Sequence, residues 1–367
     1  MKSVYISVIN DLVTDQRVQR VANLLTDQGM DVTCIGRRRK WSPALEGKRF
    51  KHTRFRLVFN KGPLFYLFFN LRLFIKLLFV PHPELFIAND LDTLPAVYLA
   101  AKIRRVRLIY DSHEFFTQVP ELIERKRVQA IWKLIESWLL PRIDYALTVS
   151  YPIAEIYRRL YGTRFRVVRN FPEHRKVIPG DINSEESPIV IYQGALNVGR
   201  GLELMIESMK HLEGVRLLIA GTGDIESDLK NLVDEQGLSE QVIFMGRLEP
   251  QELVPLTCKA KLGISLEEDL GLNYRYALPN KMFDYIQCRI PVLCSHLPEM
   301  AKIVESYGIG VAIRNRDPEN IARVIRFMLE EHEAGAWSRA LEKAASELCW
   351  EIESDQYLAL VKETGAL

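Results

Sequence analysis

Residues 189–210 read IVIYQGALNVGRGLELMIESMK. Ile189–Gln193 is a short apolar run typical of a buried strand, and a turn with three glycines separates it from a helix predicted over Leu202–Lys210. A strand, a glycine turn and a helix in this order form the building unit of a parallel sheet with helices on both faces. We therefore expect an α/β protein.

The same unit recurs through the second half of the chain. Short apolar runs separated by helical segments predict five further strands: Val215–Ala220, Val242–Met245, Leu262–Ser265, Pro291–Cys294 and Ile309–Ile313. A helix is predicted over Asp317–Glu331, which opens with Asp-Pro. Six strands with intervening helices are enough for one complete domain.

The first half alternates in the same way. Its predicted strands are Val4–Ile9, Asp31–Ile35, Glu84–Ala88, Arg107–Tyr110 and Tyr145–Val149, and its predicted helices are Gln16–Asp27, Thr93–Lys102 and Val128–Leu140. A polar, turn-rich segment, residues 177–187, has the composition of a domain linker. A chain of 367 residues is also long enough for two cores. We predict two Rossmann-like domains, 1–176 and 188–346, joined by that linker.

Charge is divided unevenly between the two halves. Residues 1–176 hold 31 Lys and Arg against 16 Asp and Glu, and the remainder holds 18 against 31. Such asymmetry indicates a basic face that meets an anionic partner, either a membrane surface or nucleic acid. The alternative is an ordinary solvated surface on two domains that attract each other.

The basic half also contains an unusual apolar segment. Gly62–Val80 reads GPLFYLFFNLRLFIKLLFV, which Asn70, Arg72 and Lys76 make too polar for a membrane span. Basic and aromatic residues alternate just before it, in Lys48–Lys61. The two segments are typical of an interfacial helix beside a polybasic patch that sits on an anionic bilayer. A core helix preceded by a basic loop is the equal alternative.

The five cysteines form no C-x-x-C pair and accompany no histidine cluster. We interpret them as buried thiols of a reducing compartment, without a disulfide or metal role. The N-terminal segment reaches acidic residues after a short apolar stretch, so we expect a first strand there and no signal peptide.

Ligands of such domains bind at the carboxyl ends of the strands. After the first strand the chain reads Ile9–Asp15, INDLVTD, which lacks G-x-G-x-x-G and argues against an NAD enzyme. In the second half, Arg200 lies among glycines at a helix start, a combination suited to a diphosphate. Gly221 and Gly223 lie in a similar turn, which favours a plain strand-to-helix connection when taken alone.

The stretch NYRYALPNKMFDYIQCRIPV, residues 273–292, is the most informative. Lys281 is expected at the start of a helix, where a cation is unfavourable unless an anion offsets it. This favours phosphate beside Lys281, with Asp284 one turn later as an acceptor for ribose hydroxyls. A plain capped helix with surface Lys and Asp is the alternative.

With these motifs, nearly the whole chain resembles the retaining family 4 glycosyltransferases of the GT-B fold. YQGALNVGRGLELMIESM, LLIAGTGDIESDL, VIFMGRLEPQEL and LPNKMFDYIQCRIPV are similar to motifs of the family's second domain, the last in its "PNK" variant. VINDLVTDQRVQRVANLLTDQGMDVTCIG, LFIANDLDTLPA and LIYDSHEFF resemble its first domain. The resemblance implies two domains facing each other across a cleft, with a C-terminal helix, 347–367, crossing back to the first.

The resemblance also implies roles for single residues. Arg200 and Lys281 would bind the donor diphosphate and stabilise the leaving group, and His113 would lie near the donor sugar and acceptor. The residues implied to line the donor site are Gly194, Gly199, Gly221, Gly223, Tyr276, Leu278, Asn280 and Asp284. Those implied on the acceptor side are Asn10, Asp11, Asp15 and Arg17.

The chain departs from the family pattern at two positions. Tyr276 stands where the first Glu of the E-x7-E motif is expected, and Asp284 stands at the second. Ala195 replaces a second Arg found in many relatives. Tyr276 can hydrogen-bond a sugar but cannot act as a carboxylate, and another acid, such as Glu268 or Asp269, is a candidate to substitute for it.

The resemblance implies a metal-independent transferase without a cofactor. Its donor would be a nucleotide sugar, most directly a UDP-sugar. Its acceptor would be a glycan or a lipid-linked intermediate in the synthesis of surface polysaccharide or glycoconjugates. Lys48–Val80 would contact an anionic membrane. No nucleic-acid recognition motif is present, and we expect a cytoplasmic protein, on the inner face of the plasma membrane if it binds lipid. Two alternatives stay open: a catalytically inert sugar-binding or assembly subunit, and a nucleotide-sugar epimerase.

Overall fold

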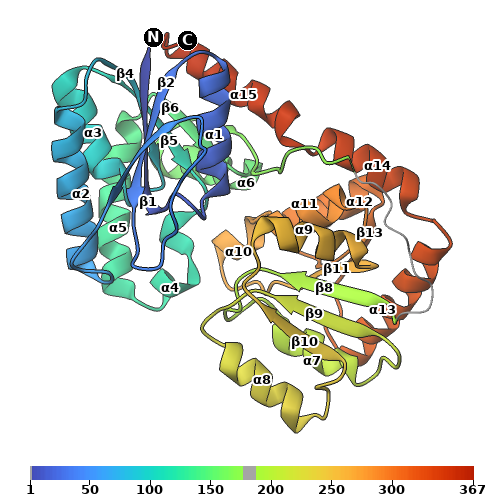
Figure 1. Ribbon diagram of the computed structural model, residues 1–367. Coiled ribbons are helices and arrows are strands. Elements are labelled where there is room, and N and C mark those ends of the chain that lie inside the picture. Colours follow the sequence, from blue (N-terminus) through green and yellow to red (C-terminus); the bar gives the residue numbers. More distant parts are fainter. Residues whose placement is uncertain (1, 177–186) are drawn as a thin grey trace. The chain divides into compact units, whose positions relative to one another are not determined.

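The computed structural model describes residues 2–176 and 187–367, which divide into two compact units (Figure 1). Unit 1 contains the chain up to Asn170 together with Glu353–Leu367, and unit 2 contains Phe171–Ile352. Each unit is built on its own parallel sheet. The prediction of two Rossmann-like domains is therefore confirmed, as is the return of the C-terminal segment to the first domain.

The boundaries lie a few residues from the predicted ones. Unit 1 ends at Asn170 rather than at residue 176, because Phe171 packs on Phe283 of unit 2 with ring centroids 4.4 Å apart. Unit 2 continues to Ile352, inside the last helix. Of the predicted linker, 177–187, only Ser187 lies within the described residues.

The sheet of unit 1 has seven strands in the order β3-β2-β1-β4-β5-β6-β7. The strands are β1 (Ser3–Asp11), β2 (Asp31–Arg37), β3 (Lys51–Phe55), β4 (Pro83–Asn89), β5 (Arg107–Ser112), β6 (Tyr145–Thr148) and β7 (Phe165–Val167). The chain runs outward from β1 to β3 and then returns to β4 on the other side of β1. The loops after β1, β4 and β5 consequently meet at one edge of the sheet.

The two edge strands of this sheet, β3 and β7, were not predicted from the sequence. β3 lies inside the segment interpreted as a polybasic loop, and β7 has only three residues. Edge strands of this kind are short and charged, so they carry little apolar signal.

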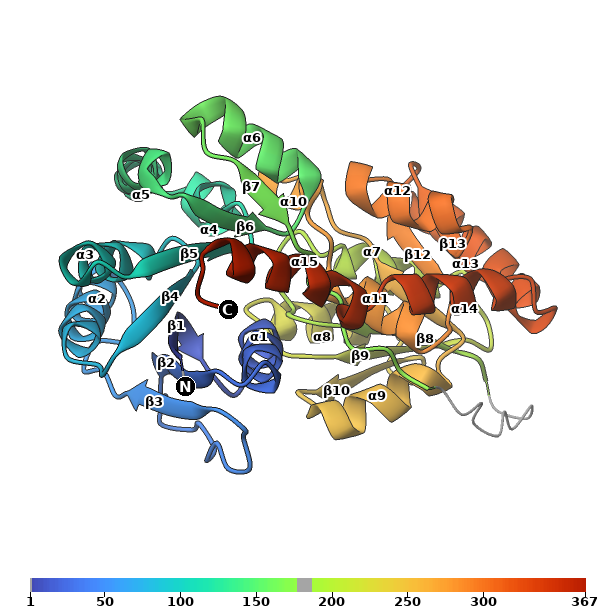
Figure 2. The ribbon, with the colours of Figure 1, turned by 90° about the horizontal axis from the view of Figure 1, so that it is seen from above.

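The helices of unit 1 are α1 (Gln16–Asp27), α2 (Pro63–Leu78), α3 (Leu94–Arg104), η1 (Phe116–Gln118), α4 (Pro120–Ile123), α5 (Lys126–Leu139), η2 (Leu140–Arg142), α6 (Tyr151–Tyr161) and most of α15 (Trp350–Glu363). Figure 2 shows α2, α3 and α5 along one face of the sheet and α1 and α15 along the other. The predicted apolar face of α1 is buried, and the Asp15 side chain caps its first turn.

Helix α2 has one buried face and one exposed face. Phe65, Phe69, Leu73 and Leu77 recur every four residues and are buried, so one face belongs to the core. Other large apolar residues of α2 are exposed. Across the described parts of the chain, no helix is long and apolar enough to cross a membrane.

Unit 2 has a six-stranded sheet in the order β10-β9-β8-β11-β12-β13. Its strands are β8 (Ile189–Gln193), β9 (Arg216–Ala220), β10 (Val242–Gly246), β11 (Leu262–Ser265), β12 (Val292–Ser295) and β13 (Gly310–Ile313). Its helices are α7 (Leu202–Met209), α8 (Glu226–Glu235), α9 (Pro250–Lys259), α10 (Leu272–Tyr276), α11 (Asn280–Gln287), α12 (Pro298–Tyr307), α13 (Pro318–Glu333) and α14 (Ser338–Glu347). All six predicted strands are present, and two buried apolar clusters pack the sheet.

One prediction about the cysteines was wrong. Cys258 on α9 and Cys288 at the end of α11 form a disulfide, whereas Cys34, Cys294 and Cys349 are free and buried as expected. The pair is possible because α9 and α11 pack together and bring the two Cα atoms to 4.7 Å. A sequence separation of 30 residues gave no sign of this proximity.

Candidate active site

In unit 2, two predicted site cations converge on one carboxylate. Lys281, the second residue of α11, is buried, and its Nζ donates to Glu267 Oε1 at 2.8 Å. Arg200, from the loop before α7, brings Nη1 to 3.7 Å from the same oxygen. Each cation also lies over an aromatic ring, Lys281 over Tyr192 and Arg200 over Tyr274. The site is therefore organised around a buried negative charge.

Glu267 is held in place from several sides. Ser265 Oγ donates to its Oε2 at 2.7 Å, and Arg316 donates to the backbone carbonyls of Leu266 and Glu267 at 3.0 and 2.8 Å. Burial alone would raise the pKa of the Glu267 carboxyl, but the charges of Lys281 and Arg200 outweigh it and leave the pKa below its ordinary value. Glu267 is thus an ionised, preorganised carboxylate.

This carboxylate differs from the two that the sequence suggested. Glu268 lies 3.8 Å from Arg316, and Asp269 pairs with Arg275 at 2.6 Å. Tyr276, at the position expected for a Glu, ends α10 and is half-buried. Glu267 was missed, although its place directly after β11, at the carboxyl end of the sheet, was a usable signal.

The start of α11 explains how a lysine is tolerated there. Pro279 precedes the helix, Leu278 packs against the core, and Asn280 is the exposed first residue. A cation at a helix N-terminus needs an anion to offset it. The chain supplies that anion itself, as Glu267.

Asp284, expected to face a ribose, has protein partners on both carboxylate oxygens. Arg175 Nη2 donates to Oδ1 at 3.1 Å, and Gln193 Nε2 donates to Oδ2 at 2.9 Å. Gln193 in turn accepts from Thr257 Oγ1 at 2.7 Å. Asp284 thereby ties α11 to the end of β8 and to α9.

The glycines of the predicted donor site lie where two loops approach closely. Gly194 follows β8, with Lys281 Cε 3.5 Å from where a Cβ would stand, and Gly199 lies in the loop before α7. Gly221, at φ +150°, leaves no room for a Cβ, which would fall 1.8 Å from the Gly194 carbonyl oxygen. A Cβ on Gly223 would likewise meet the backbone of Leu196 at 2.2 Å. Backbone packing between the two loops is sufficient to explain Gly221 and Gly223.

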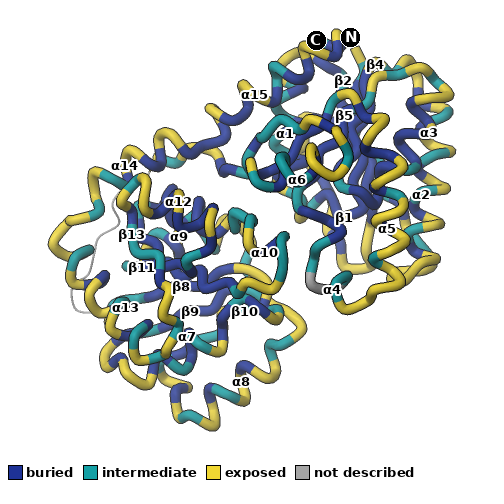
Figure 3. Tube along the Cα trace, turned by 180° about the vertical axis from the view of Figure 1, so that it is seen from behind, coloured by how far each residue is buried: buried dark blue, intermediate teal, exposed yellow. Residues whose placement is uncertain are grey.

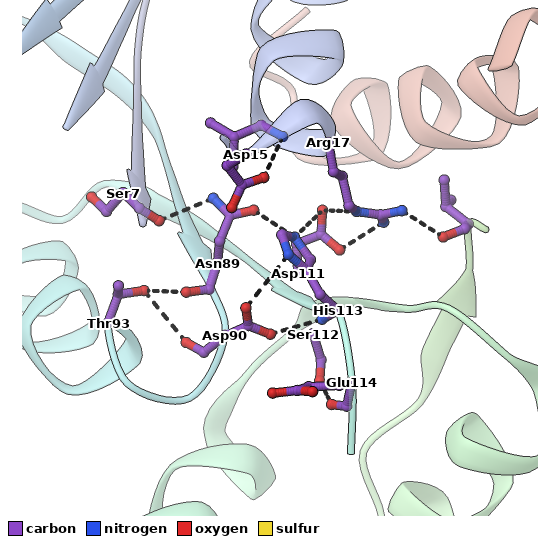
Figure 4. A network of polar contacts seen from close by, with 12 residues as sticks. Ser7, Asp15, Arg17, Asn89, Asp90, Thr93, Asp111, Ser112, His113 and Glu114 are labelled. Atoms are coloured by element: carbon purple, nitrogen blue, oxygen red, sulfur yellow. Dashed lines mark hydrogen bonds and ion pairs between the residues drawn. The ribbon is translucent and has the colours of Figure 1, made fainter. Parts of the chain in front are cut away.

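In unit 1, His113 lies at the centre of a polar network (Figure 4). Its Nε2 is 2.9 Å from Asn89 Oδ1, and its Nδ1 is 3.4 Å from Asp90 Oδ2. Asn89 donates its amide to the Ser7 carbonyl, which leaves Asn89 Oδ1 to accept from His113. Both ring nitrogens therefore face acceptors.

Nearby charges set the protonation of this network. Burial opposes the charge on His113, but Asp90 and Asp111 outweigh it and raise the pKa of His113 to about 9. Burial opposes the charge on Asp111 as well, yet Arg17 and His113 hold the pKa of Asp111 below its ordinary value. His113 is thus an imidazolium at neutral pH, which donates hydrogen bonds and cannot accept a proton.

The four residues assigned to the acceptor side have different surroundings. Asn10 is exposed near the end of β1. Asp11 is buried and accepts from Ser42, with Arg54 3.6 Å away, and Asp15 caps α1. Arg17 is buried and bidentate to Asp111, at 2.8 and 3.1 Å, and donates to the Val168 carbonyl. Of the four side chains, only that of Asn10 is exposed to solvent.

Two acids that the sequence did not single out lie beside His113. Asp90 adopts a left-handed backbone conformation at φ +60°, which is uncommon outside glycine. Asp92 is buried, its Oδ1 has no hydrogen-bond partner, and burial raises its pKa well above the ordinary value. Among the described residues there is no group of three or more His, Cys, Asp or Glu side chains that could hold a metal ion.

Comparison with known proteins accounts for most of the chain in two parts. Residues 15–173 match the family model "Glycosyltransferase Family 4", and residues 175–345 match "Glycosyl transferases group 1". Relatives of known name are distant. An alpha-D-kanosaminyltransferase of Streptomyces kanamyceticus is 25% identical over 190 residues, which are 49% of this chain and 47% of that protein. A chitobiosyldiphosphodolichol beta-mannosyltransferase of Candida albicans is 24% identical over 51% of this chain and 42% of its own. The matches span less than half the length of these relatives.

Solved structures resemble the whole chain. Sucrose-phosphate synthase from Thermosynechococcus elongatus has a TM-score of 0.79 at 16% identity, with all of both chains covered. HepE from Anabaena, solved with UDP and glucose, has a TM-score of 0.77 at 15% identity over the same full extent. At such identities the likeness establishes the fold. The chain therefore has the GT-B fold, with a region that matches the glycosyltransferase family 4 model followed by a region that matches the glycosyl transferases group 1 model.

Proposed function

We propose that this protein is a retaining glycosyltransferase that moves a sugar from a nucleotide-diphosphate donor to a glycan or lipid-linked acceptor. The observation that carries the proposal is the convergence of Lys281 and Arg200 on Glu267, at 2.8 and 3.7 Å. Two cations aimed at one buried point, beside glycine turns at the carboxyl end of a parallel sheet, suit a diphosphate. A bound diphosphate would share these cations with Glu267.

The donor is proposed to be a UDP-sugar. Structures of HepE from Anabaena contain UDP and glucose, or UDP-glucose, and HepE shares the fold of the whole chain. The role of the half-buried Tyr276 would then be to hydrogen-bond the donor. Asn280 and the backbone amides at the start of α11 would support the phosphates.

In the proposed reaction the bond between the anomeric carbon and the diphosphate oxygen breaks, and a bond from the acceptor oxygen to that carbon forms on the same face. The proton of the acceptor hydroxyl passes to the departing diphosphate. Negative charge develops on the leaving group, where Arg200 and Lys281 would stabilise it, so the proposal requires no metal ion. His113, as an imidazolium between Asp90 and Asp111, would donate a hydrogen bond or balance charge rather than act as a base.

We propose that the protein acts in the cytoplasm, in the synthesis of surface polysaccharide or glycoconjugates. The proposed acceptor side comprises Asn10, Asp11, Asp15 and Arg17. Asp11, Asp15 and Arg17 already have partners within unit 1, so their contribution would be to shape the surface. Asn10, which is exposed, would contact the acceptor.

A calorimetric titration tests the proposal. Wild type, Arg200→Ala and Arg323→Ala are titrated with UDP, GDP, ADP and CMP. We expect one diphosphate to bind the wild type and Arg323→Ala equally, because Arg323 is an exposed residue of α13 that donates to Asn320 and has no role in the proposed donor site. Arg200→Ala should bind at least about tenfold more weakly, the loss expected for one charge-assisted contact. If no nucleotide binds a folded sample, the inert sugar-binding subunit, which the Tyr276 departure favours, replaces the transferase.

A further inference from the structure

The outward faces of α2, α3 and α5 form a broad apolar surface on unit 1. Large side chains on them are 47–70% exposed, including Leu67, Leu71 and Ile75 of α2, Ile103 of α3, and Ile131 and Leu134 of α5. The three helices lie side by side on one face of the sheet, with α3 in the middle (Figure 2). Figure 3 shows the exposed stretches along them in yellow. Exposed apolar surface spread over three adjacent helices marks an interaction site.

The charges of these helices are almost all positive. They carry seven Lys or Arg residues, two on α2, two on α3 and three on α5, and a single acidic residue, Glu136. Glu136 is buried and accepts hydrogen bonds from Thr117 and Tyr161. These helices, which the structure describes in full, therefore present cations and apolar side chains outward without an exposed carboxylate. Helix α15 on the other face of the sheet carries several acidic residues.

A pocket of about 270 Å³ opens at the end of α3, where β5 and β6 begin. Lys102, Arg105, Arg107 and Arg142 line it, with Asp144 as the only acid among its lining residues. Cations in the last turn of a helix commonly offset its dipole, which would account for Lys102. Arg107 and Arg142 reach the pocket from β5 and η2, so the helix dipole does not explain them.

Aromatic rings join this pocket to the apolar surface. Tyr98 lines the pocket and packs edge-on against Trp138 of α5, with centroids 5.9 Å apart. Arg142 lies 5.7 Å from the Trp138 ring, and Trp138 is 46% exposed. Trp and Tyr between apolar and charged groups are typical of the membrane–water interface.

We propose that unit 1 docks on an anionic bilayer through α2, α3 and α5, and that the pocket at the end of α3 receives the phosphate of an anionic phospholipid headgroup. The apolar side chains enter the acyl boundary, and the surrounding cations meet the lipid phosphates. At about 270 Å³ the pocket is slightly smaller than typical drug-sized ligand sites, which occupy about 300–1000 Å³, and this size suits a headgroup phosphate.

The pocket is separate from the candidate active site. It lies at the amino ends of β5 and β6, whereas His113 follows the carboxyl end of β5. None of its residues belongs to unit 2, which holds Arg200, Glu267 and Lys281. The proposed docking surface is larger than the one predicted from Lys48–Val80, because it also includes α3 and α5.

Vesicle flotation of the full chain tests the docking. One set of vesicles is phosphatidylcholine alone, and the other contains about one third phosphatidylglycerol. The pocket variant changes Lys102, Arg105, Arg107 and Arg142 to Gln. The charge control changes four exposed cations of unit 2, Lys210, Lys259, Lys302 and Arg323, to Gln. Both variants lose the same net charge, so only the location of the lost cations differs.

We expect wild type and the charge control to float with the anionic vesicles only, and the pocket variant to bind them at least about tenfold more weakly. Ile103→Asn with Leu134→Asn should also weaken binding, whereas Leu160→Asn with Phe327→Asn, which replaces large apolar residues exposed elsewhere, should not. Urea denaturation of every variant verifies that unit 1 is folded, and UDP titration reports the proposed donor site of unit 2 separately.

Three outcomes overturn the proposal. Wild type that fails to float with anionic vesicles has no docking surface. Equal binding by wild type and the pocket variant removes the pocket from the interaction. Binding of soluble glycerol phosphate, or of an RNA oligonucleotide, without vesicle binding would make the pocket a site for a soluble anion or for nucleic acid.

Discussion

The Glu267 carboxylate lies between two cations, one of which, Lys281, is buried with it. Glu267→Gln removes the charge and keeps the shape, so it leaves Lys281 buried without its counter-ion. We expect the free energy of unfolding to fall by about 3 kcal/mol, the loss typical of a broken buried pair. Urea denaturation measures it, and Glu268→Gln is the matched control because Glu268 is 40% exposed.

If the proposed donor site is correct, UDP should restore more stability to Glu267→Gln than to the wild type, because the diphosphate replaces the missing negative charge. A Glu267→Gln variant as stable as Glu268→Gln would show that the carboxylate is not needed to balance Lys281.

His113 makes stability depend on pH. Its pKa is about 9 in the folded protein against 6.5 in the unfolded chain, so the folded state holds the proton more tightly. This contribution is fully present below pH 6.5 and is lost as the pH rises through 9, with a magnitude of about 3 kcal/mol. The measurement is urea denaturation between pH 6 and about 10 for wild type and His113→Asn.

The difference between those two curves isolates His113 from the other groups that titrate in this range. The groups that face the ring are Asn89, Asp90, Asp111 and Arg17. His211→Asn, at an exposed position, should reproduce the wild-type curve. A constant difference between wild type and His113→Asn across the range contradicts a raised pKa.

The sequence predicted a site residue where its place in a turn or at the start of a helix is enough to suggest what it binds. Arg200 lies in the glycine turn between β8 and α7, and Lys281 is the second residue of α11, so the sequence predicted an anion beside each of them. Glu267 depends on the path of the chain after β11, which no periodicity encodes. Asp90 and Asp111 lie 21 residues apart in sequence and meet only because β4 and β5 are neighbours. The disulfide between Cys258 and Cys288 likewise depends on helix packing.

At the scale of elements, the loops after β8 and β9 depend on close backbone approach. A methyl group at Gly221 would collide with the Gly194 carbonyl oxygen, which cannot move without displacing the end of β8. Gly221→Ala should therefore cost at least about 2 kcal/mol and shift the loop that carries Arg200. Gly237→Ala is the control, because Gly237 also has positive φ but has open space around it.

Gly237→Ala should cost about 1 kcal/mol, the penalty for placing a side chain in the left-handed region. Thermal denaturation compares the two variants, and UDP titration reports whether the loop has moved. Equal losses in both would mean that backbone conformation, and not the approach of the two loops, requires Gly221.

Helix α2 allows a comparison of its two faces. Leu73 is completely buried against unit 1, and Leu71 is 49% exposed on the proposed docking surface. Leu73→Ala should destabilise by about 2–5 kcal/mol, and Leu71→Ala by less than about 0.5 kcal/mol. Urea denaturation gives both values. A large loss for Leu71→Ala would mean that this face packs within the protein and cannot meet a membrane.

For the whole molecule, the order of strands and helices could be predicted because each element has its own apolar period. The division into units could be predicted only approximately, since Phe171 joins unit 2 by packing on Phe283 and the boundary at the other end falls inside the last helix. The sequence predicted an excess of positive charge in the first half but not where it lies on the surface. In the structure many of these cations lie on α2, α3 and α5 and around the pocket beside them.

The return of the chain to unit 1 can be tested through α15. Tyr357, Leu360 and Val361 are buried, and Glu363 pairs with Arg166, so the end of this helix is part of the core of unit 1. Tyr357→Ala should destabilise unit 1 by about 3 kcal/mol. Hydrogen exchange measures each unit separately, and amides of β1 and β5 should exchange about 100-fold faster while those of β11 and β12 are unchanged. Ile352→Ala, 50% exposed on the same helix, should leave both units unchanged. Faster exchange in β11 and β12 as well would mean that the two units unfold together and that the effect of Tyr357 is not confined to unit 1.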